Sequence, residues 1–410
     1  MLLRPQKENA KELQDSKELA IASRWIDKLS NQMSDCESLF PMEKEIERFM
    51  AKWDIRGISV AIMKNDSLLF AKGIGYSDED KKILMEANTE GRIASASKLI
   101  TAAGIMKLAE ENRLSLESKV FGDSGILNNS KFTNAVIDLR VFDITIKHLL
   151  QHKGGFTLGA GDPMFNTVEI IKANKLLENP SNEELVSIVL GRKLGFPPGT
   201  GHRYSNFGYM VLSLVIEKVS GKSYWDYIRE DLMTSEVAAG FHPASNFLSE
   251  RGERETHYYS PDNELVEEFT GSGKLVDRCY GGANIYGLMG AGGWCASAAS
   301  FARFISLIDG YPKENDVLSQ ESIDMMVNND EEENICIGWT DSDGKRLWVR
   351  SGTLSSAHAL AIHFSDDECW VLITNTGVWR GYHFTRILEN FVKSLHLRYS
   401  NELPRRDLFR

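Results

Sequence analysis

The sequence predicts an α+β fold in which the two ends of the chain supply a sheet and the middle supplies helices. Near the start, two short apolar runs in RGISVAIMKNDSLLFAKGIGYS surround the polar turn Lys64-Asn65-Asp66, which is typical of a β-hairpin. Near the end, three more strands are indicated by KRLWVRSG, ALAIHF and CWVLITNTG. Between about Ser95 and Arg303 the pattern is helical, with long polar insertions and Gly-Pro-rich loops such as FPPGTG.

Helices are expected to flank this sheet. One is predicted at residues 42–53 (MEKEIERFMAKW), directly after Pro41, and another at 382–399 (YHFTRILENFVKSLHLRY) closes the pattern. Residues 8–33 carry helix formers and little turn chemistry. We therefore expect residues 1–41 to be a helical N-terminal extension, which packs either on the body of the protein or on a second subunit.

The composition bounds the class of protein. With 410 residues, 42% of them hydrophobic and 26% charged, the chain is long enough to bury a substantial core. A net charge of −11, from 47 basic and 58 acidic residues, argues against nucleic acid as a partner. No apolar run reaches the roughly 18 residues that would suggest a membrane span.

The beginning of the chain and its cysteines bear on the cellular compartment. The start MLLRPQKENAKELQ turns polar too soon for a signal peptide. A periplasmic or other extracytoplasmic location in a bacterium is the expectation if an export signal was removed. The five cysteines are widely spaced and lack a C-x-x-C pair, which favours ordinary buried or free thiols. They are Cys36, Cys279, Cys295, Cys336 and Cys369.

A serine and a lysine three residues apart begin the helical pattern at GRIASASKLITAAGIMKLAEE. At positions i and i+3 of a helix, Ser95 and Lys98 face the same way. Serine becomes a nucleophile when a neighbouring base takes its proton, and a buried lysine near a helix N-terminus is a base when its amine is partly neutral. The N–H of Ser95, free at the helix start, could stabilise an oxyanion. An isolated S-x-x-K is more often a capping serine with a surface lysine.

Two further motifs give this pair a context. The segment HRYSNFGYMVLSLVIEKV places Tyr204 and Asn206 just before a helix, where the phenol could shuttle a proton and the amide could orient Lys98 and bind a substrate carbonyl. In VRSGTLSSAHALAIHF, Arg350 and Ser351 supply a cation and a hydroxyl. Gly352 would let the substrate lie against the strand edge, and the N–H of Thr353 is a candidate second oxyanion donor.

These motifs, in this order, resemble the serine β-lactamase and penicillin-binding-protein superfamily with its S-x-x-K, Y-x-N and K-T-G-type boxes, in particular the branch of class C β-lactamases, DD-carboxypeptidases and related esterases. RGISVAIMKND, ITIKHLLQHKGG, FPPGTGHRYSNFGYM and GAGGWCASAASFARFI strengthen the likeness. The resemblance implies an antiparallel sheet flanked by terminal helices and packed on an all-helical lobe. The domain would span 42–398, with the α/β lobe at 42–93 and 304–398 and the helical lobe at 94–303.

The resemblance also implies roles for the site residues. Ser95 would be the nucleophile, Lys98 its activating partner and Tyr204 the proton shuttle, while Asn206 and the strand from Arg350 to Thr353 would bind substrate. No metal and no cofactor are implied.

Three departures from the family pattern point away from efficient β-lactam hydrolysis. Arg350 stands where the third box usually has Lys or His, and a guanidinium keeps its proton, so it is suited to gripping a carboxylate and not to proton transfer. The turn Leu354-Ser355-Ser356 replaces a small glycine-containing one, and FTLGAGD lacks the glutamine that often holds the substrate amide. We expect a hydrolase of an ester or a peptide-like amide.

Several alternatives remain open from sequence. One is a non-catalytic member of the fold that binds a peptide or a cell-wall fragment, and another is a true β-lactamase. His148 and His152, four residues apart, have a metal-binding spacing but no H-E-x-x-H pattern. His358 and His363 could line the cleft or lie at the surface. Trp294 and Tyr286 could wall a pocket or belong to the core.

Overall fold

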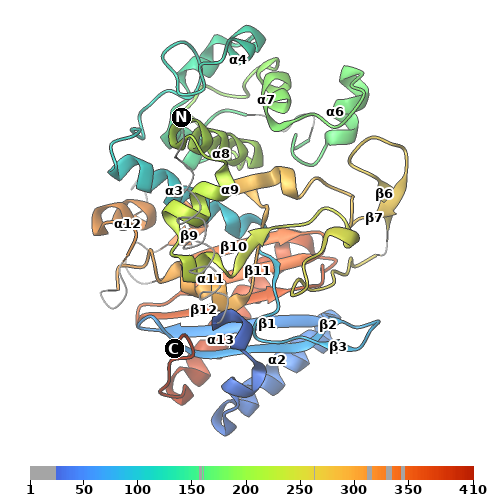
Figure 1. The fold of residues 1–410 in the computed structure, drawn as a ribbon, viewed down its shortest axis with the longest axis vertical. Helices are drawn as coiled ribbons and strands as arrows, with labels where there is room; N and C mark the ends of the chain where they lie inside the picture. Colours follow the sequence, from blue (N-terminus) through green and yellow to red (C-terminus); the bar gives the residue numbers. More distant parts are fainter. Residues whose placement is uncertain are drawn as a thin grey trace, which may run out of the picture.

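A seven-stranded antiparallel sheet forms one end of the molecule in the computed structural model, which describes residues 25–156, 159, 161–262, 264–311, 316–328, 335–342 and 347–410 (Figure 1). The strand order is β3-β2-β1-β12-β11-β10-β9. The strands are β1 (Gly57–Lys64), β2 (Ser67–Asp78), β3 (Ile83–Leu84), β9 (Asp341–Ser342), β10 (Trp348–Leu354), β11 (Ala357–His363) and β12 (Glu368–Thr374). The predicted hairpin and the three predicted C-terminal strands are confirmed, and the pairing of β1 with β12 joins the two ends of the chain.

Alternating side chains give the sheet two buried faces, as the period of two along a strand requires. On β1, Val60 and Ile62 face the helices α2 (Phe40–Trp53) and α13 (Phe384–Tyr399), whereas Ala61 and Met63 join the main core on the opposite face. The second face is covered by α11 (Ala298–Ile305), which packs on β1 and β12. The two flanking helices predicted from sequence are thus confirmed, α2 beginning two residues early with Pro41 in its first turn.

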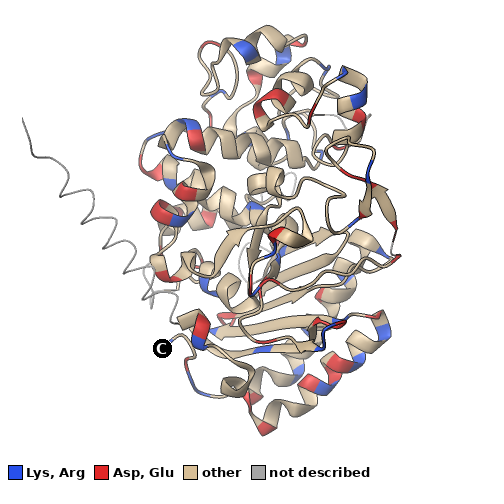
Figure 2. Cartoon of the chain, turned by 45° about the vertical axis from the view of Figure 1, so that its right-hand side comes forward, with Lys and Arg blue, Asp and Glu red and all other residues tan. Residues whose placement is uncertain are grey.

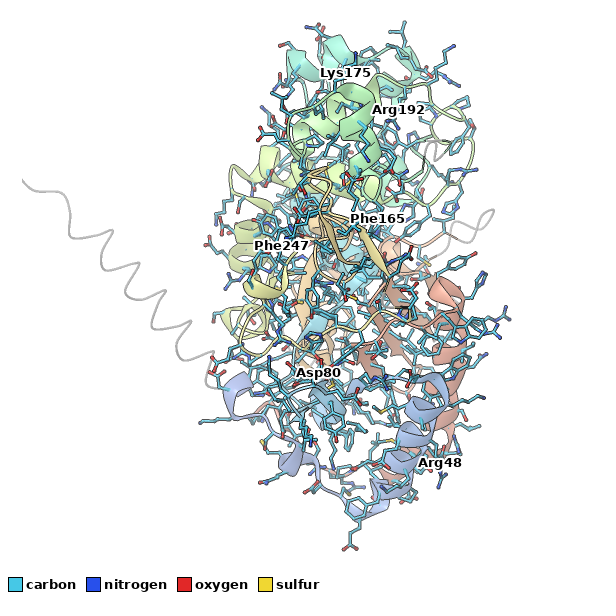
Figure 3. All side chains as sticks on the ribbon, turned by 90° about the vertical axis from the view of Figure 1, so that its right-hand side faces the viewer. Arg48, Asp80, Phe165, Lys175, Arg192 and Phe247 are labelled. Atoms are coloured by element: carbon cyan, nitrogen blue, oxygen red, sulfur yellow. The ribbon has the colours of Figure 1, made fainter. Side chains whose placement is uncertain are left out.

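Helices dominate the other lobe, which Lys175 and Arg192 mark at the far end from Arg48 on α2 (Figure 3). Its helices are α3 (Ser97–Glu110), α4 (Ser130–Ala135), α5 (Ile146–Leu150), α6 (Thr167–Asn174), α7 (Asn182–Leu190), α8 (Asn206–Ser220), α9 (Tyr224–Tyr227), α10 (Ser235–Ala238) and α12 (Gln320–Val327). The segment 94–303 is not entirely helical, however. It contributes β5 (Phe241–Pro243) and β8 (Trp294–Ala296) to a small sheet with β4 (Gly91–Arg92), and the hairpin of β6 (Leu265–Glu267) with β7 (Leu275–Asp277).

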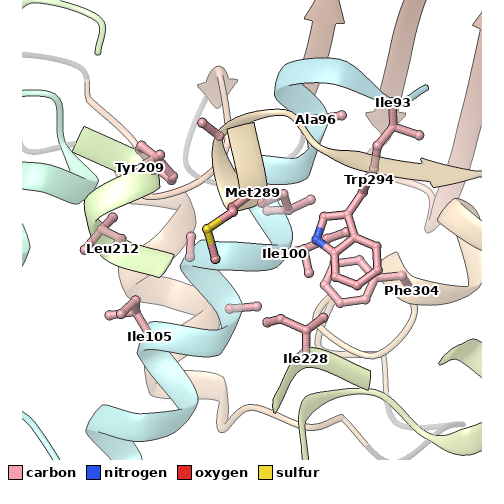
Figure 4. Close-up of a cluster of buried hydrophobic side chains, with 14 of the residues drawn as sticks. Ile93, Ala96, Ile100, Ile105, Tyr209, Leu212, Ile228, Met289, Trp294 and Phe304 are labelled. Carbon is pink, nitrogen blue, oxygen red and sulfur yellow. The ribbon is translucent and has the colours of Figure 1, made fainter. Parts of the chain in front are cut away.

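Helix α3 is buried on nearly all sides at the centre of the molecule. Ile100 and Ile105 on this helix lie among side chains from α8, α11 and the turn before β8, and Trp294 and Phe304 close one side of the cluster (Figure 4). Full burial of each large apolar side chain contributes about 1.5–3 kcal/mol. The first turn of α3 is therefore held by a rigid core.

The chain termini lie against the sheet lobe. Trp25 Nε1 donates to the carbonyl oxygen of Leu408, and the Trp25 ring lies 5.2 Å from that of Phe409. Ser34 exchanges hydrogen bonds with the backbone of Ala71 on β2. The described part of the expected N-terminal extension thus packs on the body of this chain, while residues 1–24 lie outside the described residues.

The distribution of charged residues and the state of the cysteines are those expected from the composition. Basic and acidic residues are interspersed over the surface helices, and the strands of the sheet carry few of either (Figure 2). All five cysteines are free thiols, as expected. Among the described helices, none combines the length and the apolar character needed to cross a bilayer.

Candidate active site

Ser95 lies where the small sheet leads into α3. Strand β4 ends at Arg92, and a single 3₁₀ turn, Ala94–Ala96, carries the serine into the helix. Ala94 has a φ of 50°, a left-handed conformation that is costly for a residue with a β-carbon. Such strain persists only where the surroundings enforce it, and here it sits next to the candidate nucleophile.

Lys98 reaches Ser95 from one turn along the chain, as the spacing predicts. Its side chain is fully buried, and its Nζ lies 3.3 Å from Ser95 Oγ, 2.7 Å from Asn206 Oδ1 and 2.5 Å from the carbonyl oxygen of Ala291. Burial, opposed in part by Tyr204 and reinforced by the charge of Arg350, lowers the pKa of Lys98. The neutral form of the Lys98 amine is therefore more populated near neutral pH than that of a solvated lysine.

Asn206 connects Lys98 to an acidic residue that the sequence analysis did not single out. Ser205 caps α8 by accepting the N–H of Gly208, which places Asn206 at the first helical position. The Asn206 amide accepts from Lys98 through Oδ1 and donates through Nδ2 to Asp162 Oδ2 over 2.6 Å. This series of hydrogen bonds, from Asp162 through Asn206 to Lys98, fixes the positions of the amide and the amine. No motif spacing in the sequence predicts Asp162.

Tyr204 completes the group on the side facing solvent. Its side chain is 40% exposed, but its hydroxyl turns inward and donates to Ser95 Oγ over 2.8 Å. Burial of the hydroxyl opposes ionisation, yet the positive charges of Lys98 and Arg350 outweigh this effect and lower the pKa of Tyr204. The phenolate form is stabilised by the same two cations.

His152 holds Tyr204 in place and does not pair with His148 as a metal site. Its Nδ1 accepts the N–H of Ser205, its carbonyl accepts the N–H of Arg203, and its ring lies 4.4 Å from the ring of Tyr204. Burial and the nearby Lys98 and Arg350 charges hold the pKa of His152 well below its usual range. His148 instead uses Nδ1 to accept the N–H of Thr145 in a capping box.

Strand β10 approaches Ser95 through one of its two faces. A β-carbon at Gly352 would lie 2.9 Å from the backbone nitrogen of Ser95 and closer still to the carbonyl oxygen of Ile93. The glycine is thus required for contact between β10 and the Ser95 turn. The strand and the nucleophile turn form one unit.

Arg350 lies on the same face of β10 and is 3% exposed. Its Nη1 donates to the carbonyl oxygen of Gly338 over 2.7 Å, and its Nη2 donates to the carbonyl oxygen of Ser95. Both Nη groups of the guanidinium therefore donate to backbone carbonyls. They do not form the bidentate pair toward a substrate carboxylate that was expected from the sequence. The arginine instead places a fixed positive charge beneath Lys98 and Tyr204.

Ser351 and Thr353 point to the opposite face of β10. Thr353 Oγ1 lies 3.2 Å from Thr385 Oγ1 on α13 and 3.2 Å from His358 Nδ1, so neither hydroxyl of this pair faces Ser95. The backbone N–H groups point in a different direction from these side chains. The N–H of Ser351 donates to Thr340 Oγ1, on the side of β10 away from β11, and N–H groups two residues apart on a strand point the same way. The N–H of Thr353 is thereby directed to the open strand edge.

Four other aromatic and histidine candidates are placed away from the reacting groups. His358 is buried between Thr353 and Phe384, and His363 stacks on Trp348, with their ring centroids 4.6 Å apart. Burial lowers the pKa of each histidine to about 4. Trp294 belongs to the core, and Tyr286 is half-exposed against Trp225.

A cavity of about 460 Å³ opens beside Tyr204. Its walls include His152, His202, Trp339 and Arg350. Of the three candidate reacting groups, Tyr204 borders this space, which is large enough for a small substrate, and Tyr204 in turn contacts Ser95.

Comparisons with known proteins identify the family of the chain. A family model described as Beta-lactamase matches residues 42–354. Protein flp of Staphylococcus aureus (strain N315) is 34% identical over 187 residues, which are 46% of this chain and 34% of that protein. Penicillin-binding protein 4* of Bacillus subtilis (strain 168) is 30% identical over 176 residues, 42% of this chain and 35% of that protein. The matches span about a third of the length of these curated relatives.

Solved structures show the same fold. The D-amino acid amidase of Ochrobactrum anthropi SV3 has a TM-score of 0.65 at 18% identity, covering 89% of this chain and 99% of that one. FmtA of Staphylococcus aureus has a TM-score of 0.63 at 18% identity, covering 94% and 97%. The octameric penicillin-binding protein homologue of Pyrococcus abyssi has a TM-score of 0.59 at 23% identity, covering 82% and 73%. With a family model over most of its length and this fold, the chain belongs to the beta-lactamase family, within the serine β-lactamase and penicillin-binding-protein superfamily.

Proposed function

We propose that the protein is a serine hydrolase that cleaves an ester or a peptide-like amide through an acyl-enzyme on Ser95. The observation that carries the proposal is the hydrogen-bonded series Tyr204, Ser95, Lys98, in which the Ser95 hydroxyl lies between a phenol and a buried amine. Family membership supports a hydrolase, and the geometry supports these three residues as its reacting groups.

The three hydrogen-bond neighbours of Lys98 Nζ suit its ammonium form, which has three donors, and also allow its neutral form. An –NH₂ group has two N–H donors and one lone pair. In the structure Lys98 Nζ donates to Asn206 Oδ1, to the Ala291 carbonyl and to Ser95 Oγ. In the neutral form the first two acceptors would take the two N–H donors, and the lone pair would be left for Ser95 Oγ. Ser95 can then donate its proton to Lys98 while it accepts from Tyr204, which is the arrangement that general-base activation of a serine needs.

Acylation follows from these positions. Ser95 Oγ attacks the substrate carbonyl carbon as its proton passes to Lys98 Nζ. The oxyanion that develops would accept from the backbone N–H groups of Ser95 and Thr353. As the bond to the leaving group breaks, Tyr204 gives its phenolic proton to the leaving oxygen or nitrogen. The acyl-enzyme therefore holds Lys98 as an ammonium and Tyr204 as a phenolate.

Deacylation reverses these transfers with water in place of the leaving group. The Tyr204 phenolate takes a proton from water, the resulting hydroxide attacks the acyl carbon, and Lys98 returns its proton to Ser95 Oγ as the ester bond breaks. All three groups regain their starting protonation. The charge of Arg350 favours the neutral amine before acylation and the phenolate after it.

The walls of the site bear on the substrate class. Since backbone carbonyls hold both ends of Arg350, we infer that the substrate needs no carboxylate at this position. One relative is named a penicillin-binding protein and one structural neighbour a D-amino acid amidase, so a penicillin and a D-amino-acid amide are suitable probes beside a simple ester. A peptide-like substrate of this kind would fit the proposed extracytoplasmic location.

The experiment that tests the proposal is intact-mass analysis after exposure to a serine-reactive fluorophosphonate and, separately, to a penicillin. We expect one adduct per chain, mapped by peptide mass spectrometry to Ser95. Ser95→Ala should give no adduct, whereas Ser355→Ala, which removes an exposed serine in the turn after β10, should label fully.

The outcomes separate the alternatives. A fluorophosphonate adduct with turnover of an ester or amide supports the hydrolase, and fast hydrolysis of a chromogenic cephalosporin would show a true β-lactamase. No adduct with either probe would contradict the proposal and favour a non-catalytic module that binds a peptide or cell-wall fragment.

Arg350→Gln is expected to move the rising limb of the pH–rate profile to higher pH. The base form of Lys98 exists above its pKa, and the Arg350 charge lowers that pKa, so loss of the charge raises it. The measurement is kcat/KM against pH for an ester substrate. Arg350→Lys keeps the charge and should keep the position of the limb even where the rate falls, and an unmoved limb in Arg350→Gln would contradict the electrostatic role.

A further inference from the structure

A second cluster of chemically competent side chains lies under the small sheet, away from Ser95. Neighbouring strands pair Arg92 with Cys295 and Cys295 with His242, which forms a row across β4, β8 and β5. Glu255, from the loop that follows β5, packs against this row. The ligand-type atoms of His242, Glu255 and Cys295 all lie within 4.8 Å of one another.

His242 is held with one ring nitrogen aimed into the cluster. Its Nδ1 lies 3.1 Å from Glu90 Oε2, and Arg254 in turn holds Glu90 through Oε1. The other nitrogen, Nε2, is buried and has no hydrogen-bond partner. Burial lowers the pKa of His242, but Cys295, Glu255 and Glu90 outweigh burial and raise the pKa to about 12, so a metal ion must displace a proton from Nε2 when it binds.

The remaining two ligands are buried at compatible distances. Cys295 Sγ lies 3.5 Å from Glu255 Oε1, and His242 Nε2 lies 3.6 Å from Glu255 Oε2. Tetrahedral zinc, with bonds of about 2.0–2.3 Å, separates its ligand atoms by roughly 3.2–3.7 Å. The Glu255 carboxylate is also fixed by the hydroxyl of Tyr258, 2.8 Å from Oε1.

We propose that His242, Glu255 and Cys295 form a binding site for a zinc ion, with Glu90 as the residue that orients His242. A zinc ion with three protein ligands takes water as its fourth. The charges around the cluster favour a dication. The three negative charges of Glu90, Glu255 and a Cys295 thiolate exceed the two positive charges of Arg92 and Arg254.

The alternative is a metal-free ion pair between His242 and the two glutamates. It accounts for Nδ1, but the distance of 3.6 Å from Nε2 to Glu255 is too long for a hydrogen bond, so a proton there stays unsatisfied. Burial raises the pKa of the Cys295 thiol to about 11, so zinc must displace a proton from sulfur when it binds.

The position of the cluster gives the ion a structural role. Strand β4 leads through Ile93 directly to the strained Ala94 and to Ser95. An ion that joins β5, β8 and the Glu255 loop would fix the small sheet on which this turn begins. Because it binds the folded state, zinc should raise the melting temperature.

A comparison cluster on the sheet lobe also has a histidine with a buried, unpartnered Nε2, but it contains no thiol. Asp366, Glu368 and His396 also lie within ligand distance of one another. Glu368, however, already accepts from Lys64 and Ser400 through Oε1 and from Trp370 through Oε2. His396 therefore offers a matched control for a histidine in an acidic cluster without a thiol.

The test uses the full chain, stripped with a chelator under reducing conditions and then equilibrated with zinc or cobalt. We expect one retained ion per chain by elemental analysis, and a thiolate-to-cobalt charge-transfer band in the cobalt form. His242→Asn and Cys295→Ser should each weaken binding at least about tenfold, Glu90→Gln should weaken it less, and His396→Asn should leave it unchanged.

The proposal is overturned if the wild-type chain retains no ion, or if the cobalt form shows no thiolate band. It is also overturned if His242→Asn and Cys295→Ser bind as tightly as the wild type. Circular dichroism checks that each variant folds. If neither folds, the wild-type stoichiometry and cobalt band decide, because within the described residues Cys295 is the thiol that lies in a three-ligand cluster.

Discussion

Replacement of Lys98 by methionine is expected to lower kcat/KM for an ester substrate by about 10³-fold, the range that loss of a general base produces. Methionine fills a similar volume, but it cannot take the proton of Ser95 and cannot donate to Asn206 Oδ1 or to the Ala291 carbonyl. The adduct rate with a fluorophosphonate, followed by intact mass, should fall with it, since the same proton transfer activates Ser95.

Two further variants separate proton transfer from charge and from helix packing. Lys98→Arg keeps a cation that does not deprotonate near neutral pH, so it should be about as inactive as the methionine variant. Lys107→Met alters the same helix near its far end, outside the candidate site, and should leave the rate unchanged. A Lys98→Met enzyme that retains more than a tenth of the wild-type rate, while folding normally, would remove Lys98 from the mechanism.

The parts of the fold that the sequence predicted are those with long and regular patterns. The apolar runs in β1, β10, β11 and β12 and the periodicity of α2 and α13 extend over seven or more residues each, enough to identify these segments as strands and helices. Strands β4, β5 and β8 have two or three residues each, and two or three residues carry no period. Their pairing is set by tertiary contacts, so the region appeared helical throughout.

The same distinction applies to the candidate site. Ser95, Lys98, Tyr204 and Asn206 stand in local motifs, and the structure brings them within hydrogen-bonding distance as expected. Asp162 joins them from a loop 44 residues before Asn206, with no local pattern. Such a contact follows from the path of the chain, which sequence periodicity does not describe.

Arg350 shows a further limit of reasoning from residue type. A guanidinium suits a substrate carboxylate, but it also suits two backbone carbonyls, and the choice depends on burial. Gly352 allows β10 to lie against the Ser95 turn. Arg350 therefore donates to the carbonyl oxygens of Ser95 and Gly338 and not to a substrate carboxylate. The residue type predicted the charge at this place correctly, while its partners were decided by the approach of two backbones.

Gly352→Ala is expected to lower kcat/KM by about 10²-fold and to destabilise the fold by about 1–3 kcal/mol. The new methyl group would lie within 3 Å of backbone atoms of Ile93, Ser95 and Ala96, and backbone cannot move aside as a flexible side chain can. Relief requires β10 and the nucleophile turn to separate, which displaces the N–H of Thr353 from the oxyanion position. Thermal unfolding and steady-state kinetics measure the two effects.

Gly208→Ala in the first turns of α8 is the matched control, because its new methyl group would meet Ser205 at an ordinary 3.5 Å. That variant should keep its activity and gain slightly in stability, since alanine favours a helix over glycine. A Gly352→Ala enzyme with full activity would mean that β10 can shift without loss of catalysis, so that no oxyanion donor lies on β10. The close contact between β10 and the Ser95 turn would then be a feature of packing alone, and the second oxyanion donor would have to be sought elsewhere than at Thr353.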